Sequence, residues 1–154
     1  MARIVKRDEV VSCVGWEAEP TAWFRVEQSQ IDAFADATLD HQFIHVDPVR
    51  AAATPFGGTI AHGFLTLSML SCFAGHFSVL VEGAVMGLNY GFDKVRFLSP
   101  VRVGSDIRAR ARVLDVQQKQ PGQVLLKYEV IIEIRDEPKP AVVAEWLGML
   151  VLAP

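Results

Sequence analysis

Two side chains that can exchange protons lie five residues apart in this 154-residue chain, Asp40 and His45. An aspartate and an imidazole that both reach one water molecule can orient it, remove its proton and return a proton elsewhere. Histidine suits such a step because its ordinary pKa of about 6.5 lets it accept or donate a proton near neutrality. The pair therefore indicates activation of a water molecule. The spacing alone leaves open a structural alternative, in which Asp40 caps backbone amides and His45 is hydrogen-bonded only for stability.

Glycines bracket the approach to the longest apolar run of the chain, at Gly57-Gly58 and at Gly63. Their spacing is not that of a dinucleotide-binding fingerprint, so a close approach of the backbone to another group is the better explanation. If Gly63 opens a helix, its unpaired N–H can donate to a substrate carbonyl oxygen, as in an oxyanion hole; tight packing is the alternative. Ser71 lies about two turns along the same helix face. It is expected either to line the pocket and contact the substrate, or to bond to the carbonyl one turn back.

Other histidines near the pair do not make a convincing metal site. His41, His45 and Asp47 are close in sequence, but Pro48 argues against the helical geometry that would align the two imidazoles. The H-E-x-x-H pattern is absent, and no compact third ligand accompanies the two histidines. We therefore expect no metal, and we expect His41 and His62 to be structural neighbours of the pair.

The bulk composition describes one domain spanning residues 1–154. A hydrophobic content of 51% suggests apolar surface buried against another subunit as well as inside. The net charge of −3 gives no reason to expect nucleic acid as a partner. Two cysteines, Cys13 and Cys72, do not make a disulfide framework. The N-terminus lacks the apolar core of a signal peptide, so a soluble, cytoplasmic protein is expected by default.

Helix signals surround the acid/base pair. Ser29 is expected to cap a short helix over residues 30–38. The stretch that carries the pair reads as an irregular loop, after which Asp47 and Pro48 should start another short helix. Residues 63–81 are apolar on nearly every side and long enough to span a membrane. Lys and Arg do not flank this run closely and hydroxyl groups interrupt it, so a buried helix is the better prediction, and no membrane partner is expected.

The spacing of apolar residues changes after residue 83. Apolar and charged residues alternate over residues 107–113 and 124–134, as in strands with one buried face. Residues 142–152 are apolar on both faces apart from Glu145, and residues 85–97 should hold one or two further strands. Tight turns join the long strands, which must therefore be antiparallel. These signals predict an α+β fold in which a curled antiparallel sheet surrounds one long buried helix.

The residues around the pair resemble those of the MaoC-like dehydratase family of hotdog-fold proteins. The resemblance lies in Asp40-x4-His45-x-Asp47-Pro48 and in the later Phe56-Gly57-Gly58-Thr59-Ile60-Ala61-His62-Gly63. It covers roughly residues 23–152 and points to the (R)-specific enoyl-CoA hydratases and the nodulation protein N-like members. The resemblance implies the hotdog fold and a homodimer with pockets near the subunit interface.

The resemblance also implies an activity and roles for particular residues. The reaction is the reversible hydration of a trans-2-enoyl-CoA to a (3R)-hydroxyacyl-CoA. Coenzyme A is then part of the substrate, and no separate cofactor is implied. Asp40 and His45 match the water-activating pair. Gly63 matches the residue whose N–H receives the thioester carbonyl, and Ser71 matches a secondary pocket residue.

Three positions depart from the family's usual pattern, because its Gly, Asn and Pro are replaced here by Leu39, Gln42 and Phe43. Gln42 keeps an amide with a longer reach, and Phe43 is expected to narrow or cover the pocket. Both are therefore predicted to contact the substrate and to set specificity. Two other functions remain open for this fold: an acyl-CoA thioesterase, and a non-catalytic subunit that binds acyl thioesters.

Overall fold

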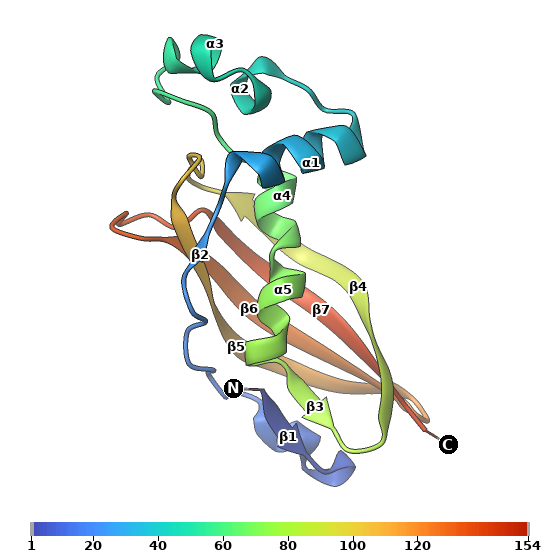
Figure 1. Ribbon diagram of the computed structural model, residues 1–154. Coiled ribbons are helices and arrows are strands. Elements are labelled where there is room, and N and C mark those ends of the chain that lie inside the picture. The colour runs from blue at the N-terminus through green and yellow to red at the C-terminus, as the bar shows by residue number, and fades with distance from the viewer. Residues whose placement is uncertain (1, 154) are drawn as a thin grey trace.

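A five-stranded antiparallel sheet forms the main layer of the protein (Figure 1). The computed structural model describes residues 2–153. The strand order is β2-β5-β6-β7-β4. The strands are β2 (Phe24–Arg25), β4 (Ala84–Phe97), β5 (Asp106–Gln120), β6 (Gln123–Ile134) and β7 (Val142–Leu152). The prediction of a curled antiparallel sheet in an α+β fold is confirmed.

The alternation of side chains explains the register of the central strands. Ile107 of β5 pairs with Ile134 of β6, and Ala109 pairs with Ile132; all four side chains are buried. A shift of one residue would turn each of them to the opposite face of its strand. Burial of this one face therefore fixes how the two strands align.

The apolar run after residue 62 forms two consecutive helices, α4 (Gly63–Ser68) and α5 (Leu70–Phe77), which lie along the concave side of the sheet (Figure 1). Met69 between them keeps helical angles, φ −62° and ψ −17°, so the two helices form one helical segment. The prediction that this helix reaches residue 81 is wrong. Val79–Val81 form strand β3, which pairs in parallel with β1 (Arg3–Val5). β-branched valines favour extended backbone, and the pairing with β1 gives them partners there.

Aromatic contacts join the end of the helix to the sheet. Phe77 is buried and meets Tyr128 and Trp146 edge-on, with ring centroids 5.9 and 6.0 Å away. The hydroxyl of Tyr128 accepts a hydrogen bond from the backbone N–H of Val79 at 3.0 Å. Aromatic pairs of this kind stabilise a fold by about 0.5–1.5 kcal/mol beyond their buried area. These contacts anchor the end of the helix on the sheet.

One side of the helical segment is exposed in the single chain. Within residues 2–153, the exposed positions on α4 and α5 are Gly63, Phe64, Ser68, Ser71, Cys72, Gly75 and His76. The expectation that every side of this helix is covered is therefore not met by the described chain alone. Among the same residues, no helix combines the length and the apolar character that crossing a membrane requires.

Three short helices gather at one end of the sheet, next to the start of α4 (Figure 1). They are α1 (Gln28–Thr38), α2 (Phe43–Val46) and α3 (Pro48–Ala52), while the 3-10 helix η1 (Arg7–Cys13) lies with β1 at the other end. The N-cap of α1 is Glu27 and not Ser29 as predicted, because the Glu27 N–H finds an acceptor in Gln30 Oε1 at 3.0 Å. The prediction for α3 is confirmed: Asp47 Oδ1 accepts from the Arg50 N–H at 3.0 Å.

The stretch between Asp40 and Asp47 is more ordered than the predicted loop. It contains α2, a single helical turn in which the N–H of His45 donates to Gln42 O at 2.9 Å and the N–H of Asp47 donates to Phe43 O at 3.0 Å. The β-branched residues here are weak helix formers. Hydrogen bonds to distant parts of the chain hold the turn in spite of that preference.

Candidate active site

His45 is held from two sides by the segment before α4. Its Nδ1–H donates to the backbone oxygen of Ile60 at 2.7 Å, and the Ile60 N–H donates to Ile44 O at 3.0 Å. The proton on Nδ1 leaves Nε2 with a free lone pair in the neutral ring. His45 is only 7% exposed, and this burial lowers its pKa below the usual value, opposed in part by the hydrogen bond to Ile60. The ring is therefore prepared to accept a proton at Nε2.

Gln28 of α1 joins the elements that carry the site. Its amide nitrogen donates to the backbone oxygen of His45 and to Asp32 Oδ1, each at 2.8 Å. Its amide oxygen accepts a hydrogen bond from the hydroxyl of Thr59, a residue that is fully buried. One side chain thus holds α1, α2 and the segment before α4 together.

Asp40 follows α1 in an irregular stretch of backbone. Leu39, the residue before it, takes left-handed angles of φ 61° and ψ 21° and ends the helix there. The carboxylate of Asp40 is 55% exposed and receives a long hydrogen bond, 3.4 Å, from the Gln42 N–H. One carboxylate oxygen of Asp40 and one ring nitrogen each of His45 and His62 all lie within 4.8 Å of one another. The structure therefore brings the predicted pair together and adds a second imidazole.

His62 is the site residue whose importance the sequence did not reveal. It is 3% exposed, and its ring stacks on that of His45 with centroids 3.8 Å apart and planes 23° apart. Its Nε2–H donates to the backbone oxygen of Asp40 at 2.9 Å. The available signal was its place directly before Gly63, because an N-cap residue lies beside the first amides of its helix.

The stacking of the two imidazoles bears on metal binding. A zinc ion needs nitrogen ligands about 2.0–2.1 Å away, with their lone pairs converging on it. Rings that lie face to face direct their in-plane lone pairs side by side, so one ion cannot lie in the plane of both. Asp40, His45 and His62 are close enough to one another to share a metal ion by distance, but the stacked rings are poorly oriented to do so. The expectation of no metal stays a prediction.

A cavity of about 310 Å³ opens beside His45. Its lining is mostly apolar and consists of His45, Phe56, Ile60, Ala61, Gly63, Thr66, Phe97, Leu98, Ser99, Pro100, Val101, Ala141 and Val142. Gly63 is the first residue of α4, and its N–H has no acceptor within the helix by position. A Cβ at this position would lie 3.1 Å from Cδ1 of Phe97, so glycine permits the close approach of that ring. Gly63 and His45 therefore face one cavity.

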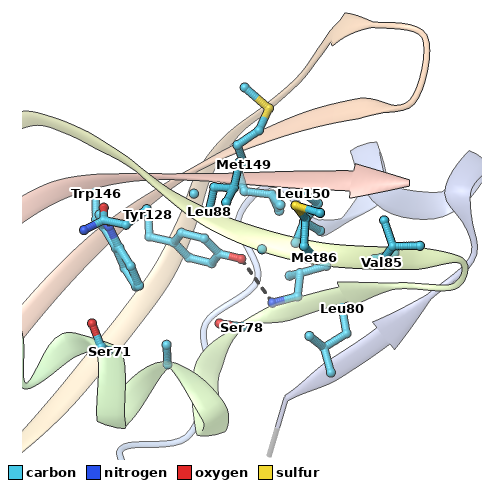
Figure 2. Close-up of a pocket in the computed structure, with 17 residues that line it drawn as sticks. Ser71, Ser78, Leu80, Val85, Met86, Leu88, Tyr128, Trp146, Met149 and Leu150 are labelled. Atoms are coloured by element: carbon cyan, nitrogen blue, oxygen red, sulfur yellow. Dashed lines mark hydrogen bonds between the residues drawn. The ribbon is translucent and has the colours of Figure 1, made fainter. Parts of the chain in front are cut away.

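Ser71 lines a different cavity. This second cavity, of about 490 Å³, lies between α5 and strands β4, β6 and β7, and Figure 2 shows it with Ser71, Tyr128 and Trp146 on its lining. Most of the other lining side chains are apolar, among them Met86 and Leu88 of β4. Although Ser71 and Gly63 are two turns apart on one helical segment, the described chain does not place them in one cavity.

Gln42 and Phe43 lie outside the linings of both cavities. Gln42 is exposed and is the N-cap residue of α2, but its side chain makes no capping hydrogen bond. The ring of Phe43 is partly buried and is covered by the guanidinium of Arg50, 4.3 Å from its centroid. Their contact with the substrate stays a prediction.

Comparison with known proteins gives consistent matches over most of the chain. The family model described as MaoC like domain matches residues 10–133. Nodulation protein N of Rhizobium leguminosarum bv. viciae is 49% identical over 149 residues, which cover 95% of this chain and 91% of that protein. The 3-hydroxyacyl-thioester dehydratase Z of Mycobacterium tuberculosis (strain ATCC 25618 / H37Rv) is 43% identical over 137 residues, covering 89% and 90%.

Solved structures agree with the fold. The (R)-hydratase from A. caviae involved in PHA biosynthesis aligns with a TM-score of 0.68 and 25% identity, covering 88% of this chain and 94% of that one. The monoamine oxidase regulatory protein from Archaeoglobus fulgius aligns with a TM-score of 0.76, covering 100% and 99%; at 24% identity it supports the fold alone. The curled sheet around α4 and α5 is the hotdog fold.

Proposed function

The chain belongs to the family of MaoC-like domains, and from that premise we propose that it hydrates a trans-2-enoyl-CoA reversibly to a (3R)-hydroxyacyl-CoA. Its relatives include proteins named as a 3-hydroxyacyl-thioester dehydratase and a 3-hydroxybutyryl-CoA dehydratase. A hydro-lyase acting on an acyl thioester is the activity that these names share. Coenzyme A is part of the substrate, and the proposed reaction uses no other cofactor.

One observation carries the proposal: the carboxylate of Asp40 and the imidazole of His45 lie within 4.8 Å of each other. His45 offers an unprotonated Nε2 because its other nitrogen donates to Ile60 O. Asp40 is exposed enough to receive a water molecule from solvent. A carboxylate and a neutral imidazole at this separation can hold one water molecule between them.

The proposed reaction moves one proton in a closed cycle. The thioester carbonyl accepts a hydrogen bond from the Gly63 N–H, which draws electrons from the double bond and makes C3 electrophilic. The water held by Asp40 and His45 loses a proton to this pair while its oxygen bonds to C3. The pair then returns a proton to C2 on the same side, so it ends in its starting state. We assign the base to the pair as a unit, because two close titrating groups share their protons.

Hydration of crotonyl-CoA and longer enoyl-CoA substrates tests this function. Loss of the double bond is followed by absorbance, and release of free coenzyme A is followed with a thiol reagent in parallel. Asp40→Asn and His45→Gln should each lower kcat by about 10²–10⁴-fold, as expected when an acid/base group is lost. His41→Gln is the matched control, because His41 is exposed and bonded to Asp36.

Three outcomes would contradict this proposal. Thiol release without loss of the double bond would identify a thioesterase in its place. Hydration at the wild-type rate by correctly folded Asp40→Asn would remove the acid/base pair from the mechanism. Tight binding of an enoyl-CoA with no turnover would instead favour a non-catalytic subunit.

The proposed assembly is a homodimer. Strand β4 is at the end of the strand order, so one of its edges has no neighbouring strand among residues 2–153. Apolar side chains are exposed on or beside it: Phe64, Leu80, Val85, Met86, Leu88, Tyr90 and Phe97. A free strand edge with exposed apolar side chains is a surface that soluble proteins normally cover. A second copy of the chain would cover it and the exposed side of α4 and α5.

A further inference from the structure

His62 contacts both members of the acid/base pair. Its Nε2–H is bonded to the backbone oxygen of Asp40 at 2.9 Å, and the same nitrogen lies 3.9 Å from Oδ2 of Asp40. Its ring stacks on His45 at 3.8 Å. Phe34 of α1 closes the other side, with its ring centroid 5.0 Å from that of His62. The imidazole of His62 therefore fixes the position of Asp40 relative to His45.

The second nitrogen of His62 has an unusual environment. Nδ1 is buried, and it has no hydrogen-bond partner among residues 2–153. Buried polar atoms are almost always paired, and leaving one unpaired destabilises a protein by about 1–3 kcal/mol. A phenylalanine would fill the same space without that penalty. An imidazole at this place therefore needs a reason other than packing.

We infer that His62 is a positioning residue, which holds the Asp40 backbone and the His45 ring at the separation that water activation needs. The inference rests on the proposed hydration. Asp40 follows a left-handed residue in an irregular stretch, and among the described contacts the bond from His62 ties its backbone oxygen to the fold. Without this bond the carboxylate is free to move away from His45. A displacement of 1 Å at a reacting group can lower a rate by about 10²-fold.

The charged surroundings of His45 make the role of His62 measurable. The groups that face His45 are Asp40, which raises its pKa, and His62, which lowers it. Asp32 accepts a hydrogen bond from the Gln28 amide, which also donates to the His45 backbone oxygen. Asp47 accepts from the Arg50 N–H as the cap of α3. The residues that line the cavity from β4, β7 and the turn between residues 97 and 101 carry no ionisable side chain. Replacing His62 therefore removes a neighbour that lowers the pKa of His45.

Two variants separate the two contacts. His62→Gln places an amide N–H where Nε2 was, so the donor to Asp40 is kept while the stacked ring is lost. His62→Phe keeps a ring against His45 but removes the donor. We expect kcat to fall by about 10–100-fold in His62→Phe and by less in His62→Gln, with a smaller change in KM than in kcat.

The pH profile supplies a second readout, because the two variants should differ in where they leave Asp40. His62→Gln lacks the neighbouring imidazole but keeps Asp40 in place, so the pKa of His45 rises and the acid limb of kcat/KM moves to higher pH. In His62→Phe the displacement of Asp40, which raises the pKa of His45, opposes this change, so the acid limb moves less. His41→Gln, a matched change at an exposed histidine, should leave kcat and the acid limb unchanged. An acid limb at the wild-type position in His62→Gln, or the same shift in both His62 variants, would overturn the inference. Equal losses of kcat in His62→Gln and His62→Phe would overturn the role of the Asp40 bond.

A titration of His45 by NMR keeps the inference separate from the proposed reaction. The chain has four histidines, so single replacements assign each ring signal. If the wild type does not hydrate enoyl-CoA, the proposed function fails, yet the His45 midpoint in His62→Gln still answers the structural question. A midpoint higher than in the wild type supports the coupling of the two rings. An unchanged midpoint rejects it. If His62→Phe does not fold, His62→Leu, which also lacks the donor to Asp40, takes its place in the comparison with His62→Gln.

Discussion

One hydrogen bond decides which nitrogen of His45 can accept a proton. The Nδ1–H donates to Ile60 O, which leaves Nε2 as the acceptor. The burial of His45, and to a smaller extent the neighbouring His62, lower the pKa of His45 and so disfavour its charged imidazolium form. At the scale of single residues, these contacts orient the side chains that the proposed hydration uses.

The pH dependence of activity follows from the lowered pKa of His45. A base must be unprotonated, so kcat/KM should persist as pH falls below about 6.5, the ordinary histidine value, and disappear at a lower pH. Stability has the same sign: the unfolded chain binds the proton more readily, so the contribution of neutral His45 is present above about pH 6.5 and is lost as pH falls. A pH series of kcat/KM measures this. An acid limb centred at or above pH 6.5 would contradict it.

Gly63→Ala tests the close approach of Phe97. The added methyl would lie 3.1 Å from Cδ1 and 3.2 Å from Cε1 of that ring, so Phe97 must move within the cavity lining. Because the backbone N–H is retained, we expect kcat/KM to fall on the order of tenfold through misplacement alone. The double variant with Phe97→Leu should recover part of the activity. If it recovers none, crowding by Phe97 is not the cause.

At the scale of elements, α1 ends in a conformation that its sequence does not favour. Leu39 takes φ 61°, a left-handed angle that places the side chain close to the following carbonyl. Glycine is the usual residue at such a helix end. This end directs the chain from α1 to Asp40.

Leu39→Gly should therefore raise the free energy of unfolding by about 0.5–1 kcal/mol, measured by urea denaturation. The left-handed strain of about 1–2 kcal/mol is relieved, and the greater freedom of glycine in the unfolded chain offsets part of that gain. Leu39 is 82% exposed, so its removal sacrifices little packing. Asp136→Gly is the matched control at φ 63°. Its gain should be smaller because aspartate tolerates left-handed angles better. A destabilised Leu39→Gly would contradict the expectation.

The whole molecule leaves an apolar helix half covered. The sheet covers one side of α4 and α5 through Leu70, Phe73 and Phe77, while the opposite side stays exposed in the single chain. The second cavity, with Ser71 on its lining, opens beside the same free strand β4 (Figure 2). A partner that covers β4 would therefore also change the surroundings of Ser71.

Leu88→Lys should weaken the proposed homodimer. Leu88 lies on β4 and is 50% exposed, and a lysine in a buried contact between copies would place an unpaired charge there. Light scattering coupled to size exclusion should show a dimer for the wild type and a monomer for the variant. Val49→Lys is the control, because Val49 is 84% exposed on α3, away from β4. A wild type that is monomeric at high concentration would contradict the assembly.

Local patterns in the sequence were enough to predict much of this protein. The alternation over residues 107–113 and 124–134 predicted paired strands, because side chains in a strand point to opposite faces by turns. Asp40 and His45 could be named as a candidate pair because they are near each other in the chain. Gly63 could be placed at a helix start because the apolar run begins there.

The tertiary structure alone decided the features that depend on distant residues. The tautomer of His45 is set by Ile60, 15 residues away, and the backbone of Asp40 is tied by His62, 22 residues away. The helix ends at Phe77 because Val79–Val81 pair with β1, close to the start of the sequence. Ser71 and Gly63 share a helical segment but face separate cavities. Spacing records which residues are neighbours along the chain, whereas these contacts arise only when the sheet curls around the helix and brings remote segments together.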